Sequence, residues 1–296
     1  MALRGVKPEA VQKRLKALFY GSAGVGKTTA AIQFPKPYLI DTERGAENDQ
    51  YVKMLESAGG AIYQTTDFDD MLTEIKSLLT EKHEYKTLII DPLTTVYADL
   101  CEKWASKLAK QSKDPNSDGT EFQRHRDKAD TQIKHLLKLL LRLDMNVIIT
   151  SHLKVKWEKV GNDFKEAGNT FDCYKKLDYL FDVVFEIQKR GKDRVGLVKK
   201  SRIESFPDGD TFPFCYEEIA TRYGRDVLER DAVAEELATP EQVKELTRLI
   251  ELLKISEDIV QKWLDKANAE KLEEMNKSVI DKCISHLNDQ IKGDAA

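Results

Sequence analysis

A pattern that suits phosphate binding lies near the start of the chain. The segment YGSAGVGKTT follows the apolar run LKALF, and Gly21, Gly26, Lys27 and Thr28 have the spacing G-x-x-x-x-G-K-[ST]. Glycines let backbone N–H groups turn toward phosphate, the lysine supplies charge to the β and γ phosphates, and the threonine hydroxyl binds Mg²⁺. The pattern therefore predicts a site for ATP and Mg²⁺, with a structural glycine turn as the alternative. The predicted nucleotide-binding residues are Gly21, Ser22, Ala23, Gly24, Val25, Gly26, Lys27, Thr28 and Thr29.

Two carboxylates follow apolar runs that have the character of buried strands. In TLIIDPLTT, Asp91 ends such a run, where its carboxylate can hold Mg²⁺ together with Thr28. In YLIDTERG, Glu43 comes just after another run, at the sheet edge where α/β proteins bind ligands. A carboxylate at that edge can accept a proton from an attacking water. The alternatives are that Asp91 caps the next turn and that Glu43 is a solvated loop acid.

Further polar residues end or follow later apolar runs. His152 comes at the end of NVIITSH, where a polar side chain can contact the γ phosphate and report its loss to the next loop. Lys200 and Arg202 in LVKKSRI are two residues apart, which predicts one face of a strand. Cations so placed could act on a neighbouring subunit's ATP. A histidine with no chemical role and a solvated strand face are the alternatives.

The segment LKVKWEKVGNDFK combines cations with aromatic side chains. Lysines suit phosphate and aromatic faces suit bases, so the mixture favours single-stranded DNA binding without sequence preference. An ordinary β-hairpin with a buried tryptophan is the alternative. The candidate DNA-binding residues are Lys154, Lys156, Trp157, Lys159, Phe164 and Lys165.

The elements that would position these residues alternate between short apolar runs and helical patterns. Near-continuous apolar runs separated by helices predict an α/β fold with a mostly parallel sheet flanked by helices. More closely spaced runs later in the chain predict hairpins at one edge of that sheet. From Thr239 and Pro240 onward the pattern becomes wholly helical. We therefore expect a P-loop core over 1–235 and a small three-helix module over 239–291.

Composition limits the kinds of partner and compartment. The net charge of −4 gives no general attraction to nucleic acid, so DNA binding requires a local basic surface. The four cysteines are scattered, which predicts reduced thiols rather than a disulfide framework or a zinc site. No apolar run approaches the roughly 20 residues that cross a bilayer, and the first residues lack the apolar core of a signal peptide. We expect a cytoplasmic protein with no membrane contact.

Together these motifs resemble the RecA family of recombinase ATPases over roughly residues 15–219. The resemblance implies a RecA-like P-loop core in which Glu43 is the catalytic glutamate, Asp91 binds magnesium and His152 is the sensor. It also implies that Lys200 and Arg202 act across a subunit interface, so that a homo-oligomer shares its active sites. The variants DTE, TSH and KSR are most similar to compact RecA-like ATPases of bacteriophages, grouped with single-strand annealing proteins. Such a protein would act in the cytoplasm of the bacterial host.

The resemblance implies a function and leaves rivals. It implies an ATPase stimulated by single-stranded DNA that supports homologous recombination or strand annealing, with two DNA-holding loops, KQSKDPNSDGTEF and LKVKWEKVGNDFK. The helical module is similar to the tails of phage recombination proteins and would bind a single-strand-binding or recombination protein. His152 stands where the bacterial recombinase has glutamine. One rival is a regulatory P-loop ATPase that acts on protein partners without DNA. The other is a small-molecule kinase, which would need an arginine-rich lid that KQSKDPNSDGT lacks.

Overall fold

A central sheet carries the positions that the sequence motifs occupy. The computed structural model describes residues 12–114, 116–161 and 163–294. Within these residues the strands run β3-β2-β4-β5-β1-β7-β8-β9 across the sheet, and β6 pairs with the outer part of β5. They are β1 (Lys16–Gly21), β2 (Pro37–Asp41), β3 (Ala61–Gln64), β4 (Thr87–Asp91), β5 (Asn146–Val160), β6 (Asp163–Phe171), β7 (Val183–Arg190), β8 (Asp193–Ser201) and β9 (Thr211–Pro213).

The sheet is mostly parallel, with antiparallel additions. Across the sheet, the neighbouring strands in the series β3-β2-β4-β5-β1-β7 pair in parallel. The pairs β7-β8, β8-β9 and β5-β6 are antiparallel. The predicted apolar runs all form strands, and the predicted edge hairpins are β7-β8 and β8-β9. The predicted fold class, a mostly parallel sheet flanked by helices with further helices at the C-terminus, is confirmed.

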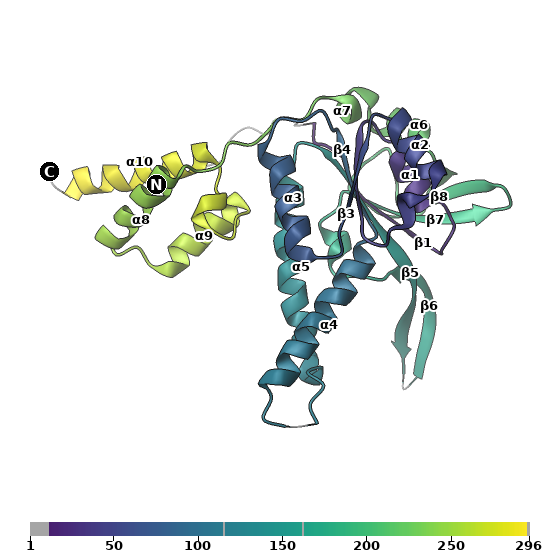
Figure 1. Cartoon of the computed structure of the whole chain (residues 1–296), viewed down its shortest axis with the longest axis horizontal. Coiled ribbons are helices and arrows are strands. Elements are labelled where there is room, and N and C mark those ends of the chain that lie inside the picture. The colour runs from purple at the N-terminus through teal and green to yellow at the C-terminus, as the bar shows by residue number, and fades with distance from the viewer. Residues whose placement is uncertain (1–11, 115, 162, 295–296) are drawn as a thin grey trace.

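Helices cover both faces of the sheet (Figure 1). Alternate residues of β1 face opposite layers, because strand side chains alternate: Leu18 and Tyr20 pack in one apolar cluster, and Ala17 and Phe19 in the other. The first cluster includes residues of α3, α4 and α5, and the second includes residues of α1, α2, α6 and α7. These helices are α1 (Lys27–Ile32), α2 (Asp49–Ser57), α3 (Phe68–Thr80), α4 (Leu93–Gln111), α5 (Arg124–Arg142), α6 (Tyr216–Tyr223) and α7 (Arg225–Glu229).

The C-terminal helices form an apolar cluster of their own. They are α8 (Pro240–Leu252), α9 (Glu257–Ala267) and α10 (Lys277–Asp294). Thr239 and Gln242 form a capping box at the start of α8, as the Thr-Pro start of the helical pattern predicts. The division at 235 and 239 remains our proposal. No described helix is long and apolar enough to cross a membrane.

Charged contacts join these helices to the core. Glu274, before α10, lies 2.9 Å from Lys76 Nζ of α3 and 3.4 Å from His135 Nε2 of α5. Burial acts to raise the pKa of Glu274, but the contacts with His135 and Lys76 outweigh it and hold the pKa well below the usual value. Glu274 is therefore a buried carboxylate whose contacts with Lys76 and His135 depend on its negative charge.

Of the two expected DNA loops, the first is a loop between α4 and α5 with helical residues at its ends, and the second has a different structure. In the first, Lys110 and Gln111 still belong to α4, and Glu121–Gln123 form a 3₁₀ turn; Pro115 lies outside the described residues. The second is not a loop, because β5 extends to Val160 and pairs with β6 as a long hairpin. The hairpin and the turn between α4 and α5 project from the same side of the molecule (Figure 1).

Candidate nucleotide and DNA sites

The predicted phosphate loop connects β1 to α1, which is the strand–loop–helix context that its pattern requires. Gly24 and Gly26 have φ angles of 73° and 93°, where glycine avoids the strain of a side chain. Lys27 Nζ donates hydrogen bonds to the carbonyls of Gly21 and Ser22 at 3.0 and 3.1 Å. Burial lowers the pKa of Lys27, while Asp91 and Glu43 act against that shift. The loop therefore holds a cation close to two carboxylates.

The two predicted magnesium ligands lie side by side. Thr28 Oγ1 donates to Asp91 Oδ2 at 2.5 Å, and Thr150 donates to the other carboxylate oxygen. Burial raises the pKa of Asp91, and the hydrogen bonds from Thr150 and Thr28 act to lower it. A hydroxyl and a carboxylate are the hard oxygen ligands that Mg²⁺ takes when phosphates complete its shell. These residues therefore fit Mg²⁺.

Glu43 lies on a loop that buried polar residues fix. The Asp41 carboxylate accepts backbone N–H bonds from Glu43, Gly45 and Ala46, at 2.9–3.2 Å. The carboxylate of Glu43 accepts a hydrogen bond from the Thr95 hydroxyl of α4. This geometry turns the predicted general base toward the start of α4, close to Asp91.

His152 lies at the same edge and contacts Glu43. It pairs in register with Gly21, and its Nε2 is 3.4 Å from Glu43 Oε1. Its backbone N–H donates to the Thr94 hydroxyl at 3.0 Å, and that hydroxyl also bonds to Ser151 Oγ at 2.9 Å. The structure thus brings the predicted base and the predicted sensor together, although 109 positions separate them in the sequence.

Sequence reasoning missed the hydroxyls and the acid that position this group. The overlooked residues are Asp41, Thr42, Thr94, Thr95 and Thr150. Asp41, Thr42 and Thr150 carried a signal, because each lies at or near the end of a predicted strand, beside a residue that the motifs singled out. Thr94 and Thr95 belong to the first turn of α4. Residues at parallel strand ends share one sheet edge, so hydroxyls there could have been expected to bond the carboxylates.

Comparisons with known proteins identify the family of the chain. A family model described as AAA domain matches residues 13–211. The chain belongs to this family of P-loop ATPases. Among solved structures, the chain is similar to the RadB recombinase, with a TM-score of 0.44 and 18% identity over 67% of this chain and 84% of that chain. No curated protein matches the chain.

Lys200 and Arg202 lie away from the AAA domain's own phosphate loop. Lys200 is opposite Val184, which pairs with Leu18, so it is level with β1 three residues before Gly21. Arg202 lies beyond the end of β8, further from the loop, which corrects the expectation that both residues belong to the strand. Both cations donate to backbone carbonyls, of Phe181 and Tyr179. The structure does not bring them to the nucleotide site of the same subunit.

The hairpin of β5 and β6 presents aromatic and basic side chains to solvent. Trp157 pairs with Glu166, and Lys159 with Phe164, which puts all four on one face. Trp157 is 59% exposed and Phe164 is 67% exposed, so the alternative of a buried tryptophan is wrong although the hairpin itself is present. The other candidate lysines differ in their pairing. Lys154 and Lys156 form ion pairs with Asp172 and Glu158, whereas Lys159 and Lys165 make none with the described residues.

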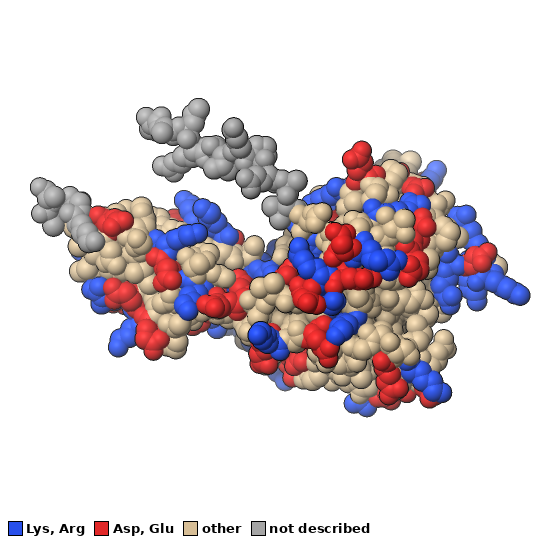
Figure 2. Space-filling view, turned by 90° about the horizontal axis from the view of Figure 1, so that it is seen from above, with Lys and Arg blue, Asp and Glu red and all other residues tan. Residues whose placement is uncertain are grey.

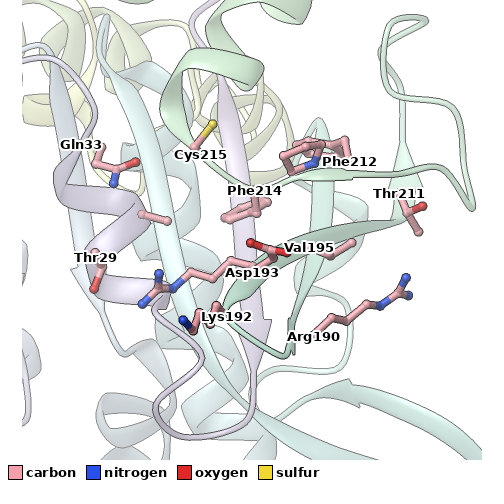
Figure 3. A pocket seen from close by; sticks show the side chains of 13 residues that line it. Thr29, Gln33, Arg190, Lys192, Asp193, Val195, Thr211, Phe212, Phe214 and Cys215 are labelled. Carbon is pink, nitrogen blue, oxygen red and sulfur yellow. The ribbon is translucent and has the colours of Figure 1, made fainter.

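The turn end of the β7-β8 hairpin carries basic residues that were not predicted as part of the site. Arg194, at the start of β8, donates from Nε to the carbonyl of Val25 at 3.1 Å and packs against Gly26. Beside it lies a cavity of about 600 Å³ whose lining includes Thr29, Gln33 and Lys192 (Figure 3). The basic residues of this hairpin form a dense group of positive charge at one end of the molecule (Figure 2).

Proposed function

We propose that this AAA domain protein is a RecA-like ATPase that binds single-stranded DNA and supports homologous recombination or strand annealing. The observation that carries the proposal is that β5 belongs to both sites. Its middle places His152 against Glu43. Its outer part carries exposed Trp157 in a hairpin where Lys159 and Lys165 form no ion pair with a described residue. One strand can thus connect the nucleotide to the DNA.

The residues at the nucleotide site have separate roles in this proposal. The loop from Gly21 to Thr28 and its lysine bind the phosphates, and Mg²⁺, held by Thr28 and Asp91, would neutralise charge on them. Glu43 accepts the proton of the attacking water, and its contact with His152 passes the change in the nucleotide to β5. The cavity beside Thr29 and Arg194 lies on the β7 side of the loop, where the nucleoside end of ATP has room.

Oligomer formation is a further part of the proposal. Because Lys200 and Arg202 lie away from their own phosphate loop, they can assist hydrolysis only from a neighbouring subunit. The C-terminal helices would contact a single-strand-binding or recombination protein. An origin in a bacteriophage and a cytoplasmic location remain predictions from the resemblance.

The ATPase rate with and without a single-stranded oligonucleotide tests the proposal at one stated salt concentration. We expect the oligonucleotide to increase the rate, and Lys27→Ala to abolish hydrolysis in both conditions. Hydrolysis that DNA does not change, together with no DNA binding, would favour the regulatory ATPase acting on protein partners. No hydrolysis and no ATP binding under any condition would refute the ATPase itself.

A further inference from the structure

A buried carboxylate lies between the phosphate loop and the β5-β6 hairpin. Glu186 of β7 is 3% exposed and pairs in register with Tyr20. Its Oε2 accepts a hydrogen bond from the Tyr20 hydroxyl at 3.1 Å and lies 3.4 Å from Lys199 Nζ. Its Oε1 accepts from Asn169 Nδ2 at 3.2 Å and from Gln188 Nε2 at 3.1 Å. Three hydrogen-bond donors and one ammonium group thus converge on one carboxylate.

These donors come from elements with different roles in the proposed function. Tyr20 directly precedes Gly21, and a Cβ added at Gly21 would be 2.5 Å from the carbonyl oxygen of Ile187, next to Glu186. The start of the phosphate loop is therefore pressed against β7. Asn169 belongs to β6, and its carbonyl oxygen is also 3.5 Å from the Tyr20 hydroxyl. The carboxylate joins the strand that enters the loop to the base of the hairpin.

The chemistry of Glu186 favours holding protein groups together over binding a ligand. Burial acts to raise the pKa of Glu186, but hydrogen bonds from Gln188 and Asn169 and the charge of Lys199 lower it below the ordinary value. The group is therefore an anion at neutral pH. A carboxylate has about four lone-pair positions; three hydrogen bonds occupy this one, and the Lys199 ammonium lies beside them. An external ligand would have to displace one of them.

Space next to the carboxylate allows the elements it joins to move. A cavity of about 610 Å³ is lined by the phosphate loop from Ser22 to Val25, by the hairpin base at Leu153 and Asn169, and by Glu186. Packed protein permits little independent movement, whereas a cavity at a junction lets one wall shift. A change in the loop can reach the hairpin through the hydrogen bonds that cross this junction.

We propose that Glu186 is a positioning residue that ties the orientation of the β5-β6 hairpin to the conformation of the phosphate loop. The inference rests on the proposed function, in which the loop binds ATP and the hairpin binds DNA. Nucleotide binding would then change the hairpin through the Tyr20–Glu186–Asn169 bonds, in addition to the contact of His152 with Glu43.

Glu186→Gln tests the proposal, because it keeps the side chain's shape and removes the charge that attracts Lys199 and the three hydrogen-bond donors. The matched control is Asp163→Asn, a similar change on the exposed surface of the same hairpin, opposite Val160 rather than Trp157. Trp157 reports on the hairpin by its fluorescence in a background carrying Trp104→Phe and Trp263→Phe. In the parent and the control we expect a non-hydrolysable ATP analogue with Mg²⁺ to change Trp157 emission. In Glu186→Gln we expect that change to fall by about fivefold or more, with nucleotide affinity within about threefold of the parent.

Tyr20→Phe is a second variant that removes one hydroxyl from the same network and leaves the apolar core filled. It decides the question if Glu186→Gln does not fold, and we expect the same loss of the nucleotide response. A response equal to the parent's in the folded variants, or no response in a parent that binds the analogue, would overturn the inference. A merely structural role would lower the melting temperature without abolishing the response. If the parent responds and the variants do not, yet no protein binds DNA, the proposed DNA function fails and the inference holds.

Discussion

Removing the Trp157 side chain should separate DNA binding from folding. The side chain is 59% exposed, and it pairs with Glu166 rather than packing in a core. Cross-strand surface pairs contribute roughly 0.2–1 kcal/mol relative to alanine, so Trp157→Ala should cost no more than about 1 kcal/mol of unfolding free energy. Stacking of a base on an aromatic ring is worth about 1–3 kcal/mol, which corresponds to roughly a 5- to 150-fold rise in Kd. Trp157→Ala should therefore weaken DNA binding more than it lowers the free energy of unfolding.

Fluorescence anisotropy of a labelled single-stranded oligonucleotide measures this effect, and a thermal melt measures stability. Val160→Ala is the matched control, because Val160 is 54% exposed on the same hairpin and offers no aromatic face. Lys159→Ala should instead reduce the salt dependence, lowering the slope of log K against log salt by about 1. A Trp157→Ala protein that melts much lower but binds DNA with the parent's affinity would refute the stacking role.

Three further predictions concern the active site and the C-terminal helices. Glu43→Gln should bind ATP with near-parent affinity and hydrolyse it slowly, because it lacks the base; turnover within a few-fold of the parent would place the base elsewhere. The double variant Lys200→Ala, Arg202→Ala should lose about 10³-fold or more in ATPase rate, and mixing it with inactive Lys27→Ala should restore activity if the cations act between subunits. Inactive mixtures that demonstrably co-assemble would exclude that arrangement. Because the pKa of Glu274 is lowered in the fold, its stabilising contribution is present above the ordinary value of 4.5 and is lost as pH falls below it. Thermal melts between pH 7 and 3 should show a smaller acid loss of stability for Glu274→Gln than for the parent, and an equal loss would contradict this.

The phosphate loop and the sheet could be predicted because their causes are local. Gly26 needs a positive φ, and the buried strands need continuous apolar residues, so both leave marks within a few neighbouring positions. The position of Asp91 at the end of a strand could be predicted for the same reason, because Asp91 ends an apolar run in a parallel sheet. The roles of Glu43 and of the candidate DNA residues remain predictions.

The hairpin shows where local reasoning was insufficient. The segment around Trp157 has the composition of a DNA loop and of a hairpin with a buried aromatic residue, and composition alone does not determine which side chains are covered. Burial depends on what packs against a strand, and none of the described helices covers the outer part of β5. The exposed tryptophan is therefore a result of tertiary structure.

The sequence by itself determined the chemical groups, the elements that carry them and the order of those elements along the chain. Only the tertiary structure decided which groups meet. His152 reaches Glu43 because β5 lies between β1 and β4 in the sheet, and Glu186 of β7 accepts hydrogen bonds from Tyr20 of β1 and Asn169 of β6. Lys200 is held away from the loop because β8 runs antiparallel to β7. Strand order and direction arise from long-range pairing, which the spacing of residues along the chain does not encode.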